Sequence, residues 1–366
     1  MSNKDCAVII IDSGFSREAT AKIRRLLGVY DLSSGLALVG SPYLAPDSEL
    51  VSERFCGDEL NHGTIILEKL LAMDSELPVI LVKAFEHGKR VNTGFADGRV
   101  VQDGWVEGYL FARDLAQKRG MTSVANLSFG GFSHAMDGTG YEAFVLEKAA
   151  SQLPAGHVLV AAAGPGDGRP IHAALVLPGG ARGAMTGYLE GRAGYNFWVD
   201  RLSANNPQNQ SSKDWLLEVF LGGQKVLEMD GKDLPDNFWN MRQQLTFSLE
   251  GRGELMLQLH NRSGSEMRFD CYIDKNDFGQ ALFLDNLDND LVSEPAVLPQ
   301  VIAVGLAEGE YGSPVVKGIS KPEIRVEGSG PISFRAPEIV FRVAQMLKAE
   351  PDLTTGDVRD RLISGN

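Results

Sequence analysis

Three side chains of the types used in nucleophilic catalysis stand at the boundaries of expected regular elements. Asp12 follows the apolar run Val8–Ile11, His62 begins an apolar helical pattern, and Ser333 stands four residues before Pro337 at the start of another. A serine hydroxyl attacks an acyl carbon when an imidazole removes its proton and a carboxylate orients that imidazole. We therefore predict that Asp12, His62 and Ser333 meet in the folded chain and carry out acyl transfer.

The residues around these positions resemble the motifs of subtilisin-like serine proteases (subtilases), whose triad follows the same order along the chain. Ile10–Gly14 resembles the family's V-I-D-[ST]-G, and His62–Thr64 resembles its H-G-T. Lys321–Ile324 resembles K-P-[DE]-[IV], and Ala336–Leu362 resembles the segment that ends the family's catalytic domain. The resemblance implies a subtilisin-like α/β fold and a serine endopeptidase with these three catalytic residues.

The serine loop departs from the family pattern. The motif G-T-S-x-A-x-P places the nucleophile at the N-terminus of a buried helix, where backbone amides and the helix dipole favour a developing oxyanion. The aligned residues Pro331–Pro337 keep Ser333 but lack the Gly and Thr before it, and Glu338 replaces a usual histidine. The alternative interpretation is that Ser333 only caps a helix.

The expected oxyanion region is Gly164, Pro165 and Gly166, after a strand that resembles the family's A-A-G-N segment. Pro165 stands where the resemblance implies an asparagine that donates to the oxyanion, and proline has no donor. Loss of one such donor costs about 10²–10³ in turnover. The backbone amides of Ser333 and of residues 166–168, and the Arg335 guanidinium, are substitute donors. We therefore expect a weak or partner-activated protease.

The segment Ala125–Gly131 resembles the family's I-N-M-S-[LF]-G strand, whose edge pairs with an extended substrate. The resemblance implies that Ser128, Phe129 and Gly130 bind a polypeptide substrate through backbone hydrogen bonds. An ordinary buried strand is the alternative interpretation.

Two acidic segments, 274–277 and 285–290, are candidates for structural calcium, which subtilases often bind. Their spacing does not match an EF-hand, and surface turns are the alternative. We predict no other cofactor and no metal at the catalytic residues. Residues 164–169 lack the spacing of a phosphate-binding loop, so nucleotide binding is disfavoured.

The catalytic residues need a rigid framework to hold them. Up to residue 170, β-branched runs alternate with helical patterns, which is typical of a parallel sheet covered by helices. Strands are expected at Ala7–Ile11, Leu77–Ala84, Thr122–Ser128 and His157–Ala163. Helices are expected at Glu18–Leu27, Thr64–Met73, Trp105–Arg119 and Tyr141–Ser151. The same character returns near the C-terminus, with a strand at Pro299–Gly305, a helix at Pro337–Lys348 and a short helix capped by Thr354 and Asp357.

Between these parts the apolar pattern changes to period two, as at Leu255, Leu257 and Leu259 and at Met267, Phe269 and Cys271. Such alternation predicts an antiparallel β-sandwich or jelly roll. We therefore predict a subtilisin-like three-layer α/β domain formed by residues 1–170 and 291–366, with an all-β domain, residues 171–290, inserted between them.

Composition narrows the partners and the location. The 366 residues are 43% hydrophobic and carry a net charge of −13, which disfavours nucleic acid or an anionic membrane surface as a partner. Three scattered cysteines provide neither a disulfide framework nor a zinc site. The apolar run Ala7–Ile11 is too short for a signal sequence, and no stretch reaches membrane-spanning length. These features predict a cytoplasmic protein.

Two functions fit the sequence. In the first, the chain is a serine endopeptidase whose β domain gates the cleft or recruits a regulatory protein partner. In the second, it is a catalytically impaired protease-like scaffold that binds protein or glycan through the β domain. The intact triad favours the first function, whereas Pro165 and Pro331 favour the second.

Overall fold

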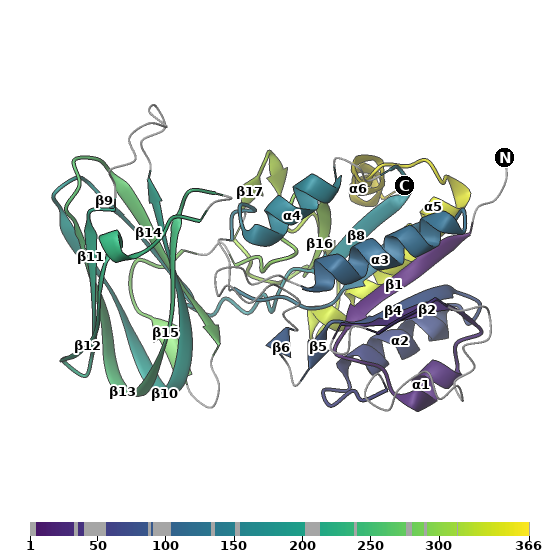
Figure 1. The fold of residues 1–366 in the computed structure, drawn as a ribbon, viewed down its shortest axis with the longest axis horizontal. Coiled ribbons are helices and arrows are strands. Elements are labelled where there is room, and N and C mark those ends of the chain that lie inside the picture. The colour runs from purple at the N-terminus through teal and green to yellow at the C-terminus, as the bar shows by residue number, and fades with distance from the viewer. Residues whose placement is uncertain are drawn as a thin grey trace.

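The computed structural model shows an α/β body with an antiparallel β body beside it (Figure 1). The structure describes residues 5–32, 36–39, 56–86, 89–90, 104–132, 136–150, 154–201, 213–237, 240–275, 280–288, 291–312 and 314–365. Within this described part, no helix has both the length and the apolar character needed to cross a bilayer.

The α/β body is built on an eight-stranded sheet. Its order is β19 (Ile324–Val326), β16 (Val301–Leu306), β8 (His157–Ala162), β7 (Thr122–Leu127), β1 (Cys6–Asp12), β4 (Pro78–Lys83), β2 (Arg25–Asp31) and β3 (Leu36–Val39). All neighbours are parallel except β2 and β3. Every residue of β1, β4, β7 and β8 is buried, as the continuous apolar runs predict for strands covered on both faces.

Helices cover both faces of the sheet, which confirms the three-layer α/β prediction. One face packs against α1 (Arg17–Ala21), α2 (His62–Met73), α5 (Ala336–Ala349) and α6 (Thr355–Ser364). The other packs against α3 (Gly104–Lys118) and α4 (Tyr141–Ala150). Side chains of β1 alternate between the two cores, with Val8 and Ile10 on the first and Ile9 and Ile11 on the second.

The helix predicted over Glu18–Leu27 is confirmed only up to Ala21 and is wrong from Arg25 onward. The helix α1 ends at Ala21, and residues 25–31 form β2 between β3 and β4. Leu26, Leu27 and Val29 are buried there. Ile23, Leu26 and Leu27 have helical spacing, but pairing with β4 overrides that local pattern because it buries the whole run.

The insert is antiparallel, as its period-two pattern predicts. Its strands run in the order β12 (Gln224–Asp230), β11 (Trp215–Leu221), β13 (Gln243–Asn261), β10 (Arg182–Arg201), β14 (Met267–Lys275) and β9 (His172–Leu177), and β15 (Gln280–Phe283) pairs with β10. The long strands β10 and β13 pair glycine with glycine midway, Gly191 opposite Gly251. Glycines at this point allow two long strands to bend over one apolar core.

After the insert, the chain passes beside the residues that follow β7 and β8. The Ser293 amide donates to the Ala163 carbonyl at 3.0 Å, and Gly131 and Glu294 exchange backbone hydrogen bonds at 3.1 and 3.2 Å. The return segment therefore lies across the carboxyl ends of β7 and β8, where ligands bind in open α/β sheets.

The remaining short elements are β5 (Phe85–Glu86), β6 (Lys89–Arg90), β17 (Val315–Val316), β18 (Ile319–Ser320), η1 (Gly231–Asp233) and η2 (Ile332–Phe334).

Candidate active site

Asp12 and His62 are brought together from two different elements. Asp12 is the last residue of β1 and His62 the first residue of α2. The His62 Nδ1 atom lies 2.8 Å from Asp12 Oδ1, and the Asp12 side chain is only 3% exposed. A buried carboxylate on Nδ1 places the proton there and leaves Nε2 as the basic nitrogen.

Two glycines allow this close approach. A Cβ atom on Gly63 would lie 2.2 Å from the Gly14 carbonyl oxygen and 2.8 Å from Asp12 Cβ. Gly14 has a φ of +147°, and a Cβ atom there would lie 2.4 Å from the Gly57 carbonyl oxygen. The glycines of Ser13-Gly14 and His62-Gly63 are thus required for the distance between base and carboxylate.

A second carboxylate, Asp58, supports the pair and was missed by the sequence analysis. Its Oδ2 accepts from the Thr64 amide at 2.9 Å and from the Thr64 hydroxyl at 2.6 Å, which caps the start of α2. Its Oδ1 accepts from the Ser13 hydroxyl at 2.8 Å, and Ser13 also donates its amide to Asp12 Oδ1. The sequence does contain a signal for this role. The first turn of α2 has no acidic residue of its own, and Asp58 is an aspartate shortly before that helix.

The electrostatic surroundings favour the protonated form of His62. Burial of the imidazole opposes its charge, but the hydrogen bond that it donates to Asp12 and the charges of Asp12 and Asp58 outweigh that cost and raise the pKa of His62 above its usual value. An imidazole of raised pKa is a stronger base once it is neutral.

Ser333 lies on the turn η2, which leads into α5. The Phe334 ring packs against the His62 imidazole with centroids 5.4 Å apart. Within the described part of the chain, the Ser333 hydroxyl makes no hydrogen bond with His62. The Ser333 backbone carbonyl accepts a hydrogen bond from the Ser128 hydroxyl at 2.9 Å. The structure thus joins Asp12 to His62 directly and brings the serine segment against the imidazole.

The predicted substrate edge continues from β7, which ends at Leu127. Ser128 is buried, Phe129 is half-buried and Gly130 is exposed. The Phe129 ring packs against Phe85 and Trp105, at 4.6 and 6.0 Å between centroids. This aromatic contact fixes Phe129 in the core, so it is the backbone of Gly130 that solvent reaches.

Ser293, which the sequence analysis did not single out, lies between the substrate edge and the oxyanion region. A Cβ atom on Gly130 would lie 2.2 Å from the Ser293 hydroxyl oxygen, and one on Gly164 would lie 3.2 Å from it. That hydroxyl is buried and has no hydrogen-bond partner in the described part of the chain. The return from the insert therefore forms one wall of the site.

The oxyanion region has unusual backbone geometry. Gly164 and Gly166 have φ values of +109° and +59°, and Pro165 between them is exposed. Tyr311 covers Gly166 and donates its hydroxyl to the Gly164 carbonyl at 3.3 Å.

Hydrogen bonds within the serine turn engage two of its backbone amides and one predicted substitute donor, the Arg335 guanidinium. The amides of Phe334 and Arg335 donate to Pro331 and Ile332 at 3.0 and 2.8 Å. The Arg335 guanidinium donates to Glu338 at 3.1 Å. Of the predicted substitutes, the amides of Ser333 and of residues 166–168 stay as candidates for binding an oxyanion.

The acidic residues predicted as calcium candidates hold the insert together. Asp285 accepts from the Thr186 amide and hydroxyl at 2.7 and 2.6 Å. Asp288 accepts from Arg268 at 2.8 Å. Residues 276, 277, 289 and 290 of the two candidate segments lie outside the described residues.

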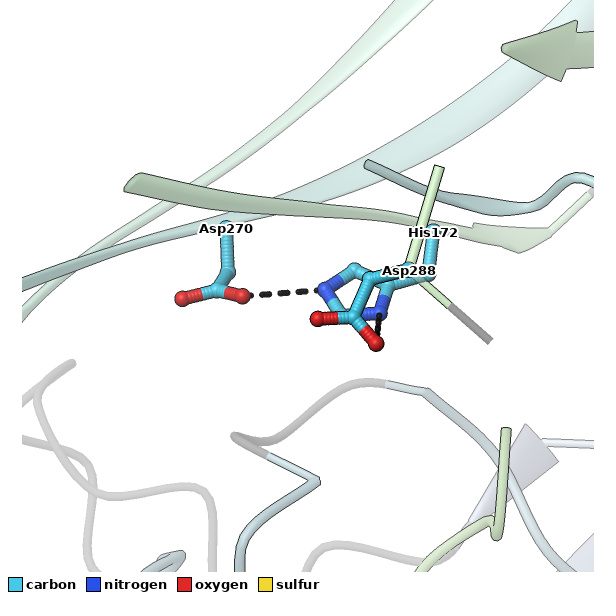
Figure 2. Close-up of side chains that lie close together, drawn as sticks. All are labelled: His172, Asp270 and Asp288. Carbon is cyan, nitrogen blue, oxygen red and sulfur yellow. Dashed lines mark hydrogen bonds and ion pairs between the residues drawn. The ribbon is translucent and has the colours of Figure 1, made fainter. Parts of the chain in front are cut away.

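His172, Asp270 and Asp288 form the cluster shown in Figure 2, in which the imidazole lies between the two carboxylates. His172 Nε2 lies 3.0 Å from Asp270 Oδ1, and Nδ1 lies 3.9 Å from Asp288 Oδ1. Burial opposes ionisation of Asp270, but bonds from His172 and Arg268 hold its pKa below the usual range. Asp270 Oδ1 already accepts from His172 and from two Arg268 nitrogens, so a metal ion there would have to displace these bonds.

The three cysteines are free thiols. Burial raises the pKa of Cys6 to about 12 and also raises the pKa values of Cys56 and Cys271. Thiolate nucleophiles have a lowered pKa, so these thiols do not compete with Ser333 as the candidate nucleophile.

No protein-family model and no curated protein matches this chain. Among solved structures, the Clostridium perfringens CspB protease is similar at a TM-score of 0.72, with 16% sequence identity, over 100% of this chain and 88% of that one. A cold-adapted subtilisin-like serine proteinase is similar at a TM-score of 0.42, with 11% identity, over 100% of this chain and 83% of that one. Together with the strand order and helix layers described above, the first match shows that this chain has the subtilisin-like α/β fold, accompanied by a separate antiparallel sheet.

Proposed function

We propose that the protein is an intracellular serine endopeptidase whose catalytic residues are Asp12, His62 and Ser333. The observation that carries this proposal is the 2.8 Å contact between His62 Nδ1 and buried Asp12, with the serine turn packed against the same imidazole. A buried carboxylate, an imidazole and an adjacent serine have a joint chemical role that helix capping alone does not require.

The proposed reaction follows from these positions. Ser333 Oγ attacks a peptide carbonyl carbon while His62 Nε2 takes the hydroxyl proton, and Asp12 stabilises the resulting imidazolium. The tetrahedral intermediate collapses to an acyl-enzyme as His62 returns the proton to the leaving amine. Water, activated by the same imidazole, then hydrolyses the ester and restores Ser333.

The polypeptide substrate is proposed to pair with the backbone of Ser128–Gly130. Activity is proposed to be weak or partner-dependent, because Pro165 has no donor and the Ser333 hydroxyl is not bonded to His62. A regulatory protein that binds the insert is the proposed activator. A reducing cytoplasmic location agrees with the three free thiols.

A second candidate function is a protease-like scaffold whose β domain binds protein or glycan. Two observations favour it, the exposed Pro165 in the oxyanion region and the Ser333 hydroxyl that makes no bond with His62. In this case the Asp12–His62 pair is a structural remnant that holds β1 against α2.

A fluorophosphonate probe distinguishes the two functions, because it forms a covalent bond only with an activated serine. We expect labelling of the full chain that is lost in Ser333→Ala and His62→Ala and kept in Ser329→Ala, an exposed serine of the same loop. Absence of Ser333-dependent labelling, alone and with cell extract added as a source of activators, would reject the peptidase and leave the scaffold.

A further inference from the structure

We propose that Ser293 is a specificity-determining residue, which restricts the proposed peptidase to peptide bonds that follow glycine or, more slowly, alanine. This restriction rests on the proposed function for the meaning of the substrate edge and of the oxyanion region. Its structural part, that the Ser293 side chain fills the space between Gly130 and Gly164, is tested below without any hydrolysis.

The Ser293 side chain lies between the substrate edge and the oxyanion region and contacts both. A Cβ atom on Gly130 would lie 2.2 Å from Ser293 Oγ and 3.0 Å from Ser293 Cβ. A Cβ atom on Gly164 would lie 3.2 and 3.5 Å from the same two atoms. Ser293 itself is 1% exposed. On the Gly130 side, the space therefore has no room for even one further carbon atom.

Hydrogen bonds hold the Ser293 backbone against both segments. Its amide donates to the Ala163 carbonyl at 3.0 Å, and its carbonyl accepts from the Val297 amide at 3.1 Å. The next residue, Glu294, exchanges backbone hydrogen bonds with Gly131 at 3.1 and 3.2 Å. Ser293 therefore cannot leave this space without breaking pairs to the residues that follow β7 and β8.

The Ser293 hydroxyl adds no hydrogen bond of its own to the described part of the fold. It is buried and has no hydrogen-bond partner there. Burial of an unpaired hydroxyl costs free energy, so stability alone would favour alanine or glycine at this position. A buried unpaired group needs another explanation, and its position between two parts of the candidate site offers one.

The residue before the scissile bond must direct its side chain toward this space. In the proposed reaction, Ser333 attacks the carbonyl carbon of that residue, whose carbonyl oxygen faces the oxyanion region and whose backbone pairs with Ser128–Gly130. Side chains of an extended chain stand out from the plane of pairing, so this one lies between the two segments. Because Ser293 fills the space, a hydrogen atom fits, a methyl group must displace Ser293, and a longer side chain is excluded.

Exclusion of this kind gives specificity through a clash with the wrong substrate rather than through added contacts with the right one. One methylene group in a fitted pocket changes kcat/KM by about 10–200-fold. We therefore expect the rate of acyl transfer to fall about tenfold from glycine to alanine, and about 10²-fold or more from glycine to leucine.

Ala296 provides a matched control for the test. It is buried in the same segment, three residues after Ser293, and belongs to the core on the α3 and α4 face of the sheet. Ala296→Gly adds backbone freedom to this segment, as Ser293→Gly does, but it leaves the Ser293 side chain in place.

Urea unfolding of the full-length chain tests the structural part without hydrolysis. Gly130→Ala places a methyl group against Ser293, so we expect it to lower the unfolding midpoint in the wild-type and Ala296→Gly backgrounds. In the Ser293→Gly background the contact is gone, and the same substitution should lower the midpoint much less. An equal drop in all three backgrounds would overturn the proposal.

Labelling of Ser333 by peptidyl diphenyl phosphonates tests the specificity. Three probes share one peptide sequence and carry the side chain of glycine, alanine or leucine at the reacting residue. In wild type and Ala296→Gly, we expect the rates to fall in that order by the factors given above. In Ser293→Gly, the alanine probe should gain about tenfold relative to the glycine probe. Equal rates for the three probes in wild type, or no gain in Ser293→Gly, would reject the role of Ser293.

A plain fluorophosphonate, which has no such side chain, separates this proposal from the proposed function. If it labels Ser333 while the peptidyl probes react at equal rates or not at all, the peptidase function stands and the role of Ser293 is wrong. If it labels nothing, the peptidase function fails and the specificity fails with it. The urea result then shows only that Ser293 fills the space between the two segments.

Discussion

The Ser128 hydroxyl donates a hydrogen bond to the backbone carbonyl of Ser333 at 2.9 Å, although 205 residues separate them in sequence. The Ser128 hydroxyl oxygen also accepts from the buried Asn126 side-chain amide at 3.0 Å. The end of the substrate strand and the candidate nucleophile are therefore parts of one polar network, so the position of one depends on the position of the other.

Ser128→Ala tests this link. Loss of the hydroxyl frees the serine turn, and we expect the rate of Ser333 labelling by a fluorophosphonate to fall about tenfold. Ser123→Ala is the matched control, because Ser123 is also buried in β7 and hydrogen-bonded, to His157 at 2.8 Å, but at the other end of the strand. Both variants should lose about 1 kcal/mol of stability in urea unfolding. Equal labelling rates in the two variants would contradict the prediction.

Asp58→Asn should change the pH dependence of labelling. The Asp58 charge helps to raise the pKa of His62, and His62 must be neutral to accept the serine proton. Labelling is therefore lost as pH falls through that raised pKa. Removal of the Asp58 charge lowers the pKa of His62 and moves the loss of labelling to lower pH. Asp74→Asn, which removes a carboxylate at the far end of α2, should leave the midpoint where it is. A midpoint that moves upward in Asp58→Asn would refute the electrostatic account.

Pro165→Asn should increase turnover. Asparagine adds a side-chain amide donor between Gly164 and Gly166, and one oxyanion donor contributes about 10²–10³ in rate. Pro165→Ala removes the ring without adding a donor and separates the effect of the amide from that of backbone freedom. Peptide hydrolysis is the measurement, and no gain over Pro165→Ala would mean that the existing backbone amides already complete the oxyanion hole.

Gly63→Ala should disrupt the site through contact alone. The added methyl group would meet the Gly14 carbonyl and Asp12, and we expect a loss of about 2 kcal/mol in unfolding free energy together with loss of Ser333 labelling. Gly356→Ala in α6 is the control, because its nearest neighbour, the Thr354 hydroxyl oxygen, would lie 3.6 Å away. That variant should gain about 0.5–1 kcal/mol from helix propensity and keep full labelling.

The sequence predicts much of this fold because the signals are local. The apolar runs of β1, β4, β7 and β8 and the capping box of Thr354 and Asp357 are written in adjacent residues, and the structure confirms them. Residues 25–27 were predicted wrongly as helix, because the strand identity of β2 comes from pairing with β4, which no local pattern reveals.

The candidate site divides in the same way. Asp12 and His62 follow from short motifs, and the structure places them 2.8 Å apart. The roles of Asp58 and Ser293 depend on contacts between segments that are distant in the chain. Such contacts emerge from packing, so composition and spacing alone do not show them.

The position of the insert has a consequence for how the protein is made. Strands β8 and β16 are hydrogen-bonded neighbours, yet β8 ends at Ala162 and β16 begins at Val301, with the whole insert between them. Closing so long a loop costs chain entropy, which a folded insert reduces by holding its own ends together. We therefore expect the insert to fold before β16 pairs with β8, and the serine turn to form last. A chain still on the ribosome would then hold its acid and base in place but lack its nucleophile, which delays any peptidase activity until synthesis has passed the insert.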